Sequence, residues 1–208
     1  MKGYFITGTD TDVGKTHVAA MLVRALRGKG ESAVGFKPIC CGGRDDAELL
    51  AAASGGDVSV NDVNPVWLRP PVAPYTAAMI EGRMIDLALI RETFVRLSAQ
   101  HTVVVEGAGG WLVPVERDYS MADMAAEFAL PVIVVVANRL GCINHTLLTV
   151  QAIRGAGMRC AGIILNHTTA ANDDAAVITN ASVLEAISGV PTLCEIAYGQ
   201  TSMELPRF

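Results

Sequence analysis

The run Gly-Thr-Asp-Thr-Asp-Val-Gly-Lys-Thr at residues 8–16 constrains this chain most, because it joins a short apolar segment to a helical pattern. Gly14 lets the backbone approach a phosphate group, and the amides that follow form an anion cradle at the helix start. Lys15 adds a positive charge for the β- and γ-phosphates, and the Thr16 hydroxyl suits a Mg²⁺ ligand. Gly8 and Gly14 enclose five residues, one more than usual. The order strand, turn, helix nevertheless predicts a phosphate-binding loop.

Short apolar runs alternate with helical patterns along the whole chain, which is typical of βαβ units and a mostly parallel buried sheet. The valine-rich runs at 103–105 and 132–136 suit strands that helices cover on both faces. We expect strands at residues 3–7, 33–37, 102–106, 131–137, 160–165 and 192–196. We expect helices at residues 16–27, 45–53, 86–98, 120–128, 143–154 and 173–187. These elements predict a doubly wound α/β fold of the P-loop NTPase type, with three layers and one domain over residues 1–208.

Local signals refine these elements. Asp86, Ser120 and either Asn144 or Asn172 are N-cap candidates, because their side chains can accept hydrogen bonds from the first turn of a helix. Residues 55–75 are rich in Pro, Asn and Gly, and each proline removes a backbone donor and fixes φ. We therefore expect one long shaped loop there, either functional or a plain surface excursion.

Composition excludes several classes of protein. The chain is 51% apolar and 18% charged, which is too hydrophobic for disorder. No apolar run reaches the roughly 20 residues that span a bilayer. The N-terminus runs directly into the phosphate loop, so we expect no signal peptide and a cytoplasmic protein. A net charge of −5 argues against a nucleic-acid or anionic-membrane surface. The five cysteines form no CxxC pair, and we expect them to be reduced.

Charged residues follow two buried strands at the edge where an open parallel sheet binds ligands. Lys37 ends the second strand and could reach a phosphate, although a solvated lysine is the alternative. Glu106 follows the third strand directly and is better explained as a Mg²⁺ ligand than as core, because burying an unpaired charge is costly. Asp45 or Asp46 could cap the next helix or approach a metal. Since Mg²⁺ takes few protein carboxylates, Thr16, Asp46 and Glu106 would be enough.

The fourth and fifth strands also end in polar segments. Residues 140–145, Leu-Gly-Cys-Ile-Asn-His, have the character of a second anion-receiving helix start, although an ordinary capped helix with His145 on its surface is the alternative. Asn166 ends the fifth strand, where its amide could read a nucleobase edge. No Ser/His/Asp or Cys/His arrangement stands out, and phosphoryl transfer needs little covalent help from protein. Two lysines, a metal and helix-start amides form a coherent set for that chemistry.

Together, residues 8–16, Lys37-Pro38, the Glu-Gly-Ala-Gly-Gly-Trp run at 106–111 and the 140–145 segment resemble the dethiobiotin synthetase family. The resemblance covers nearly the whole chain and includes the extra loop residue. It implies an ATP- and Mg²⁺-dependent cyclo-ligase of biotin biosynthesis that converts 7,8-diaminononanoate (diaminopelargonate) and CO₂ to dethiobiotin, ADP and phosphate. A carbamate would form on one amine and take the γ-phosphoryl group as a carbamic-phosphoric anhydride. The second amine would then displace phosphate and close the ring.

The resemblance also implies roles for single residues in a homodimer with active sites at its interface. The catalytic residues would be Lys15, Lys37 and Thr11. The nucleotide would be bound by Asp12, Val13, Gly14, Lys15, Thr16, His17, Glu106, Gly109 and, at the adenine, Asn166. The substrate would be bound by Thr11, Asp12, Lys37, Cys41 and, from the partner subunit at its carboxylate, Gly141, Cys142, Ile143 and Asn144. Mg²⁺ would be held by Thr16, Asp46 and Glu106.

Two other classes of protein share parts of this pattern. P-loop switch ATPases of the partitioning or division-site type usually carry an extra lysine early in the phosphate loop, where this chain has Thr9, Asp10 and Thr11. Membrane-bound members also carry an amphipathic tail, for which residues 200–208 are too short. A glutamine-dependent amidoligase would need a glutaminase domain or a Cys/His pair, and the chain offers neither. The ligase is therefore the leading hypothesis.

Overall fold

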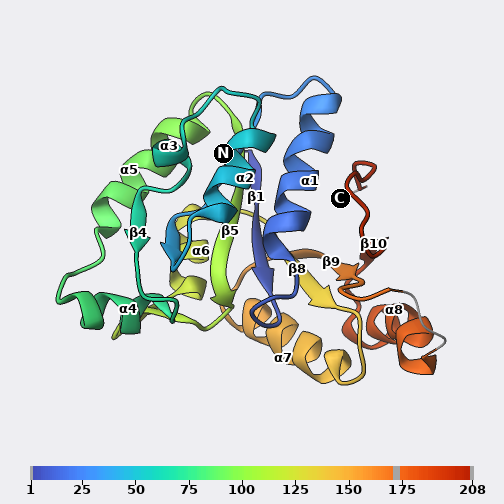
Figure 1. Cartoon of the computed structure of the whole chain (residues 1–208). Coiled ribbons are helices and arrows are strands. Elements are labelled where there is room, and N and C mark those ends of the chain that lie inside the picture. The colour runs from blue at the N-terminus through green and yellow to red at the C-terminus, as the bar shows by residue number, and fades with distance from the viewer. Residues whose placement is uncertain (1, 171–173, 207–208) are drawn as a thin grey trace.

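The computed structural model describes residues 2–170 and 174–206. Its centre is a six-stranded parallel sheet in the order β10-β9-β8-β1-β5-β2 (Figure 1). The strands are β1 (Gly3–Gly8), β2 (Ala33–Phe36), β5 (Thr102–Gly110), β8 (Val132–Ala137), β9 (Cys160–Asn166) and β10 (Thr192–Ile196). The chain runs from β1 outward to β2, returns to β5, and then crosses to β8 on the other side of β1. This reversal opens a crevice beyond the carboxyl ends of the strands, where ligands bind in such sheets.

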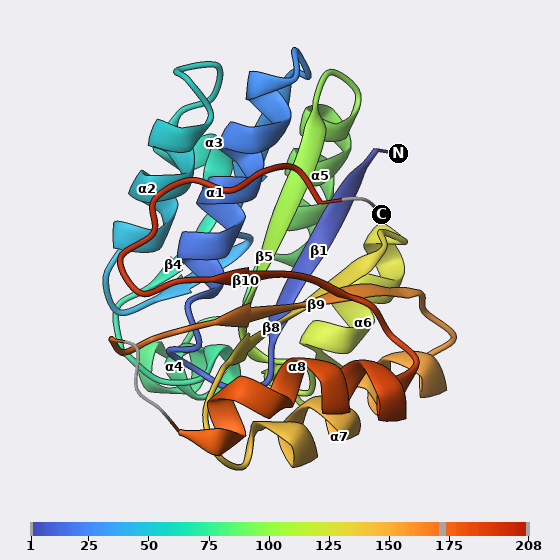
Figure 2. The same ribbon diagram turned by 90° about the vertical axis from the view of Figure 1, so that its right-hand side faces the viewer.

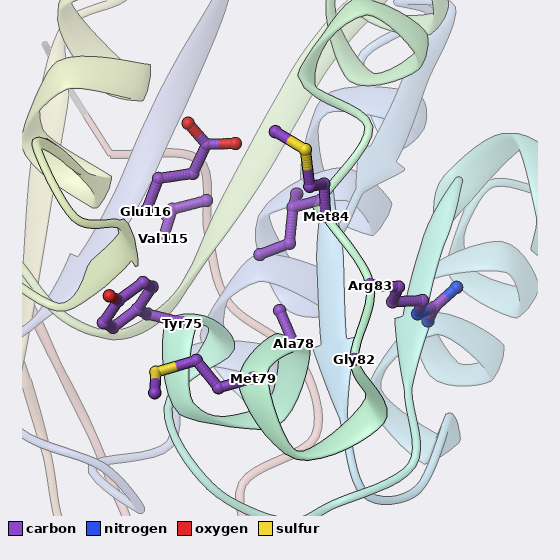
Figure 3. A pocket seen from close by; sticks show the side chains of 9 residues that line it. Tyr75, Ala78, Met79, Gly82, Arg83, Met84, Val115 and Glu116 are labelled. Atoms are coloured by element: carbon purple, nitrogen blue, oxygen red, sulfur yellow. The ribbon is translucent and has the colours of Figure 1, made fainter.

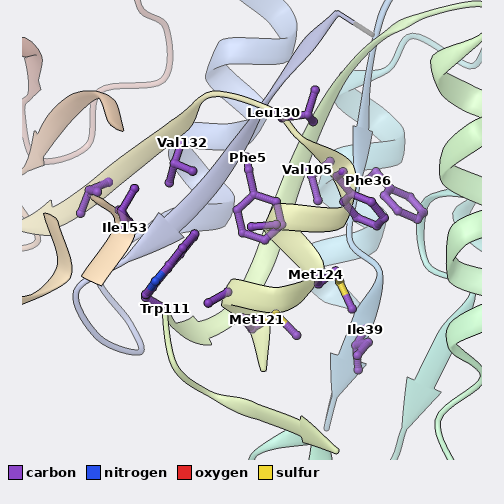
Figure 4. Close-up of a cluster of buried hydrophobic side chains, with 14 of the residues drawn as sticks. Phe5, Phe36, Ile39, Val105, Trp111, Met121, Met124, Leu130, Val132 and Ile153 are labelled. Atoms are coloured by element: carbon purple, nitrogen blue, oxygen red, sulfur yellow. The ribbon is translucent and has the colours of Figure 1, made fainter. Parts of the chain in front are cut away.

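Helices cover both faces of the sheet, which explains the continuous apolar runs of its strands. On one face lie α1 (Lys15–Gly28), α2 (Asp45–Ala53) and α3 (Val60–Val63), packed against residues such as Ile6 and Val104. The opposite core contains side chains of α4 (Pro74–Glu81), α5 (Leu87–Ser98), α6 (Met121–Phe128), α7 (Cys142–Gly155) and α8 (Ala175–Ser188). Figure 4 shows part of this second core, where Phe5 and Trp111 meet edge to face at 6.3 Å between ring centroids. The three-layer fold predicted from the sequence is confirmed.

Two of the predicted N-cap residues are confirmed by the structure and one is wrong. The side chain of Asp86 accepts a hydrogen bond from the Leu89 amide at 2.8 Å, and Ser120 forms a capping box with Asp123. Asn144 is wrong as an N-cap, because α7 already begins at Cys142 after Gly141 in the left-handed conformation. Asn172 lies outside the described residues. Polar residue types thus identified two helix starts, whereas α7 begins at a glycine turn.

The prediction of one long loop over residues 55–75 is wrong. This stretch contains α3, the strand β4 (Val66–Leu68) and the beginning of α4. A capping box between Ser59 and Asp62 starts α3, and Pro74 occupies the start of α4, where a missing amide costs nothing. β4 pairs in parallel with β3 (Ile39–Cys41) in a small separate sheet. The prolines therefore separate short elements instead of excluding them.

Other differences concern strand ends and short strands. β5 continues four residues beyond Glu106 to Gly110, which pairs with Gly8. Sequence patterns do not predict β3 or the antiparallel pair β6 (Pro114–Glu116) and β7 (Tyr119–Ser120). The remaining predicted elements agree with the structure to within two residues. Within residues 2–170 and 174–206, none of the helices combines the length and apolar character required to cross a membrane.

Candidate active site

The phosphate loop joins β1 to α1 and is held in one shape by local contacts. Gly14 is the N-cap of α1 with φ of 90°, and a Cβ there would lie 2.1 Å from Asn166 Nδ2. Asn166 donates a hydrogen bond from that nitrogen to the carbonyl of Val13 at 2.9 Å. Lys15 donates from Nζ to the carbonyl of Asp10 at 2.8 Å. A larger residue at position 14 would therefore clash with Asn166 of β9, so this position requires glycine. The amides at the start of α1 can bind an anion.

A buried carboxylate connects this loop to the ends of β2 and β5. Glu106 is 1% exposed, and its Oε1 accepts hydrogen bonds from Thr16 Oγ1 at 2.8 Å and from Lys37 Nζ at 2.6 Å. Lys37 Nζ also lies 2.9 Å from Asp46 Oδ2. The structure thus brings together four predicted residues from α1, the end of β2, α2 and β5.

The charges in this cluster shift one another's pKa values. Burial acts to lower the pKa of Lys37, but the carboxylates of Glu106 and Asp46 outweigh it and raise that pKa. Burial likewise acts to raise the pKa of Asp46, but Lys37 outweighs it and the pKa is lowered. Burial lowers the pKa of Lys15, and the charge of Lys37 lowers it further. Lys37 and Asp46 are therefore both charged at neutral pH.

The donor set fits a magnesium ion. Glu106 Oε2 is buried without a hydrogen-bond partner among the described residues, an arrangement that is costly unless a cation or donor satisfies it. Thr16 bonds this carboxylate directly, and Asp46 is linked to it through Lys37, which contacts both carboxylates. No group of three or more His, Cys, Asp or Glu side chains that could hold a metal occurs in the described parts of the chain. Such a group is unnecessary for Mg²⁺, which takes one or two protein carboxylates together with phosphates and water.

A pocket of about 310 Å³, here called the Lys37 pocket, opens beside this cluster. Its polar lining includes Thr11, Lys37 and Cys41. Burial raises the pKa of Cys41 to about 11, so its thiol is neutral. The predicted residue Gly109 also lines the pocket, and its φ of 65° favours glycine. The apolar walls, which sequence reasoning missed, come from Ile39, Pro71, Val72, Ala73, Pro74, Ala108 and Val113.

The predicted residues at the start of α7 are not part of the pocket lining, although Arg139, just before this helix, lies 3.9 Å from Asp10 of the phosphate loop. Gly141, Cys142, Ile143 and Asn144 do not line the Lys37 pocket of their own chain. Cys142 is buried, Asn144 is exposed, and the neighbouring Leu140 is 80% exposed. Within one chain, the structure therefore does not join this helix start to the lysine and carboxylate cluster.

A second cavity, of about 400 Å³, is formed by α4, the segment after it and β6 (Figure 3). Tyr75 and Met79 line it from α4, and Val115 and Glu116 line it from β6. It contains none of the predicted site residues, and most of its lining is apolar. The Lys37 pocket, which is smaller, is the one that carries groups suited to phosphoryl transfer.

The chain is similar in sequence to known proteins. A family model described as an AAA domain matches residues 2–204. The chain is 46% identical over 206 residues to the ATP-dependent dethiobiotin synthetase of Akkermansia muciniphila, covering 99% of this chain and 96% of that protein. It is 48% identical over 187 residues to the enzyme of the same name from Anaeromyxobacter dehalogenans strain 2CP-C, covering 88% and 83%.

Solved structures of partition and division ATPases share the fold. The septum site-determining protein MinD of Pyrococcus horikoshii, complexed with Mg-ADP, has a TM-score of 0.57 and 17% identity over 95% of this chain and 82% of its own. A ParA family ATPase from Chlorobium tepidum has a TM-score of 0.55 and 10% identity over 94% and 84%. At such identities the likeness extends to the fold alone.

The three-layer fold and the loop at the α1 N-terminus define a protein of the P-loop class. Within that class, identity to the two synthetases extends over most of each chain. The chain belongs to the dethiobiotin synthetase family and is an enzyme of the ligase class.

Proposed function

We propose that this chain converts 7,8-diaminononanoate and CO₂ to dethiobiotin with ATP and Mg²⁺, as a cytoplasmic enzyme of biotin biosynthesis. The observation that carries the proposal is the position of Lys37, which bonds Glu106 beside the phosphate loop and also lines an apolar-walled pocket. A cation at this boundary can face a phosphate on one side and an organic substrate on the other. The curated relatives, which carry the name of this activity, support the same assignment.

The proposed nucleotide site begins at the α1 N-terminus. The triphosphate would be bound by Asp12, Val13, Gly14, Lys15, Thr16 and His17, with Glu106 and Gly109 close by. Thr16, Asp46 and Glu106 would hold Mg²⁺, which when bound would offset negative charge on the β- and γ-phosphates. Asn166 would contact the adenine. One N–H of its Nδ2 donates to Val13 and fixes the orientation of the amide, so that Oδ1 would accept a hydrogen bond from the adenine amino group.

The proposed substrate site is the Lys37 pocket. Its apolar walls suit the aliphatic chain of the diamine, while Thr11 and Cys41 supply polar groups and Asp12 would approach the amines. Carbamate formation and phosphoryl transfer both place negative charge on oxygen atoms near Lys37. Lys15 and Lys37 would stabilise that charge without reorganising, because their side chains are already held by the contacts described above.

The proposed enzyme is a homodimer with shared active sites. The amides at the start of α7, from Gly141 to Asn144, have the character of an anion site but do not line the Lys37 pocket of their own chain. A partner subunit that contributes this helix start would supply the carboxylate-binding group that the pocket lacks. The separation of the lysine and carboxylate cluster from the helix start of α7 within one chain supports an active site that is completed across a dimer interface.

A product assay tests the proposal directly. Purified protein is incubated with ATP, Mg²⁺, bicarbonate and 7,8-diaminononanoate, and dethiobiotin is measured by mass spectrometry alongside phosphate release. We expect both products in equal amounts, and neither when the diamine is omitted. Phosphate release that does not depend on the diamine, with no dethiobiotin formed, would contradict the proposal and favour a switch ATPase.

A further inference from the structure

The C-terminal segment, residues 197–206, turns back after the last strand of the sheet and passes across α1 (Figure 2). His17, in the first turn of α1, has its ring Nε2 2.6 Å from the backbone carbonyl oxygen of Gln200. Because a carbonyl only accepts, the ring nitrogen is the donor. Across residues 2–170 and 174–206, this is the only hydrogen bond between the C-terminal segment and the rest of the chain.

The segment is shaped to present this carbonyl. Gln200 donates its backbone N–H to the carbonyl of Ala197 at 3.0 Å, and its side-chain Oε1 accepts from the Ala197 amide at 3.0 Å. Its Nε2 also donates to the carbonyl of Ser202 at 2.6 Å. Gly199 supplies the left-handed residue of the turn, with φ of 74°. Gln200 therefore organises a compact turn whose outward bond goes to α1.

The two ends of the segment are held near the nucleotide-binding elements. It leaves β10 where the His167 amide donates to the carbonyl of Ile196 at 2.9 Å, one residue after Asn166 at the end of β9. Further along, Met203 and Leu205 pack against the core cluster that contains the apolar face of α1. The turn thus spans from the end of β9 to the first turn of the phosphate-binding helix.

We propose that the imidazole of His17, which bonds Gln200 and leaves any contact with the triphosphate to the backbone of this residue, is a positioning group that fixes residues 197–202 as a side wall of the nucleotide site. The inference rests on the proposed binding of nucleotide at the phosphate loop. His17 lies one residue after Thr16, and Ile196 bonds the residue after Asn166, so the turn connects two elements of the proposed nucleotide site.

Two measurements test this role: the affinity for a nucleotide and the resistance of the turn to proteolysis. ADP binding is measured by calorimetry, and chymotryptic cleavage after Tyr198, which is 62% exposed, reports on the turn. His17→Ala should weaken ADP binding about fivefold, the effect of one lost hydrogen bond, and should speed cleavage. The KM for ATP should rise by a similar factor while kcat changes less than twofold. His17→Gln, which keeps an N–H donor, should recover most of the affinity, and Ser202→Ala is the matched control within the turn.

Two results would overturn the role of His17. One is ADP binding by His17→Ala that equals the wild-type value, whatever the cleavage rate. The other is a folded His17→Gln that binds as poorly as His17→Ala, which would show that the donated bond is irrelevant. Should His17→Ala fail to fold, Gln200→Ala loosens the same turn without touching α1 and must weaken ADP binding. Dethiobiotin formation by the wild-type chain is measured separately, so failure of the proposed function is distinguishable.

Discussion

Replacing Lys37 with methionine tests the buried charge cluster most severely. The lysine is 5% exposed and bonds Glu106, which is 1% exposed, at 2.6 Å. Methionine fills similar space but leaves Glu106 with Thr16 as its one hydrogen-bond partner and with Oε2 still unpaired. Removing one member of a buried ion pair costs about 3–5 kcal/mol, because the remaining charge is left uncompensated. We therefore expect Lys37→Met to lower the free energy of unfolding by that amount.

Urea unfolding without nucleotide measures the loss, and Arg91→Met provides the control. Arg91 forms a bidentate pair with Glu127 at 2.7 and 2.9 Å, but both side chains are well exposed, so its loss should cost about 1 kcal/mol or less. The double variant Lys37→Met/Glu106→Gln should recover at least half of the stability lost by Lys37→Met, because the stranded charge is gone. Dethiobiotin formation by Lys37→Met should fall about 10²–10³-fold or more.

The reasoning would be refuted by a Lys37→Met chain that loses no more stability than Arg91→Met. It would also be refuted if the double variant were less stable than Lys37→Met alone. Near-normal turnover by Lys37→Met would refute the catalytic role independently of stability.

Three further predictions use other parts of the site. Mixed dimers of Lys37→Ala and Asn144→Ala chains should regain activity in the dethiobiotin assay, and no rescue in verified mixed dimers would contradict shared sites. Inosine triphosphate should give a kcat/KM at least about tenfold below that of ATP, because the bond from Asn166 Nδ2 to Val13 orients Oδ1 to accept from the adenine amino group, which inosine lacks; equal values would contradict this. The pKa of Asp46 is lowered by Lys37, so its contribution to stability is present above the unfolded pKa of about 3.9 and is lost as pH falls through the folded value. Urea unfolding of Asp46→Asn should therefore vary less with pH below about pH 5 than the wild type, and parallel curves would contradict this.

Sequence patterns predicted the sheet well because its strands are covered on both faces. The runs around Val104 and Val134 had no other explanation than burial on both sides, and the structure leaves both residues fully buried. Residues 55–75 were misjudged because their elements are short and depend on distant partners. β4 exists through its pairing with β3, a contact that local composition does not encode. Only the Ser59 capping box could have revealed α3 beforehand.

The candidate site shows the same division. The cost of burying a charge predicted a special role for Glu106, and the structure gives it two charged or polar donors. The partner of that carboxylate could not be predicted, because Lys37 and Glu106 are far apart in sequence and come together only through the order of the strands. The apolar walls around Val72 and Val113 and the bond from His17 to Gln200 also arise from long-range packing. Such contacts join segments that no local pattern connects.

The position of the two substrates tests the central claim most directly. Crystals grown with a non-hydrolysable ATP analogue, Mg²⁺ and 7,8-diaminononanoate should show the triphosphate on Gly14, Lys15 and Thr16. The diamine should occupy the Lys37 pocket with an amine directed at the γ-phosphate. A diamine bound instead in the cavity lined by Tyr75 and Met79, or a triphosphate away from the α1 N-terminus, would contradict the account.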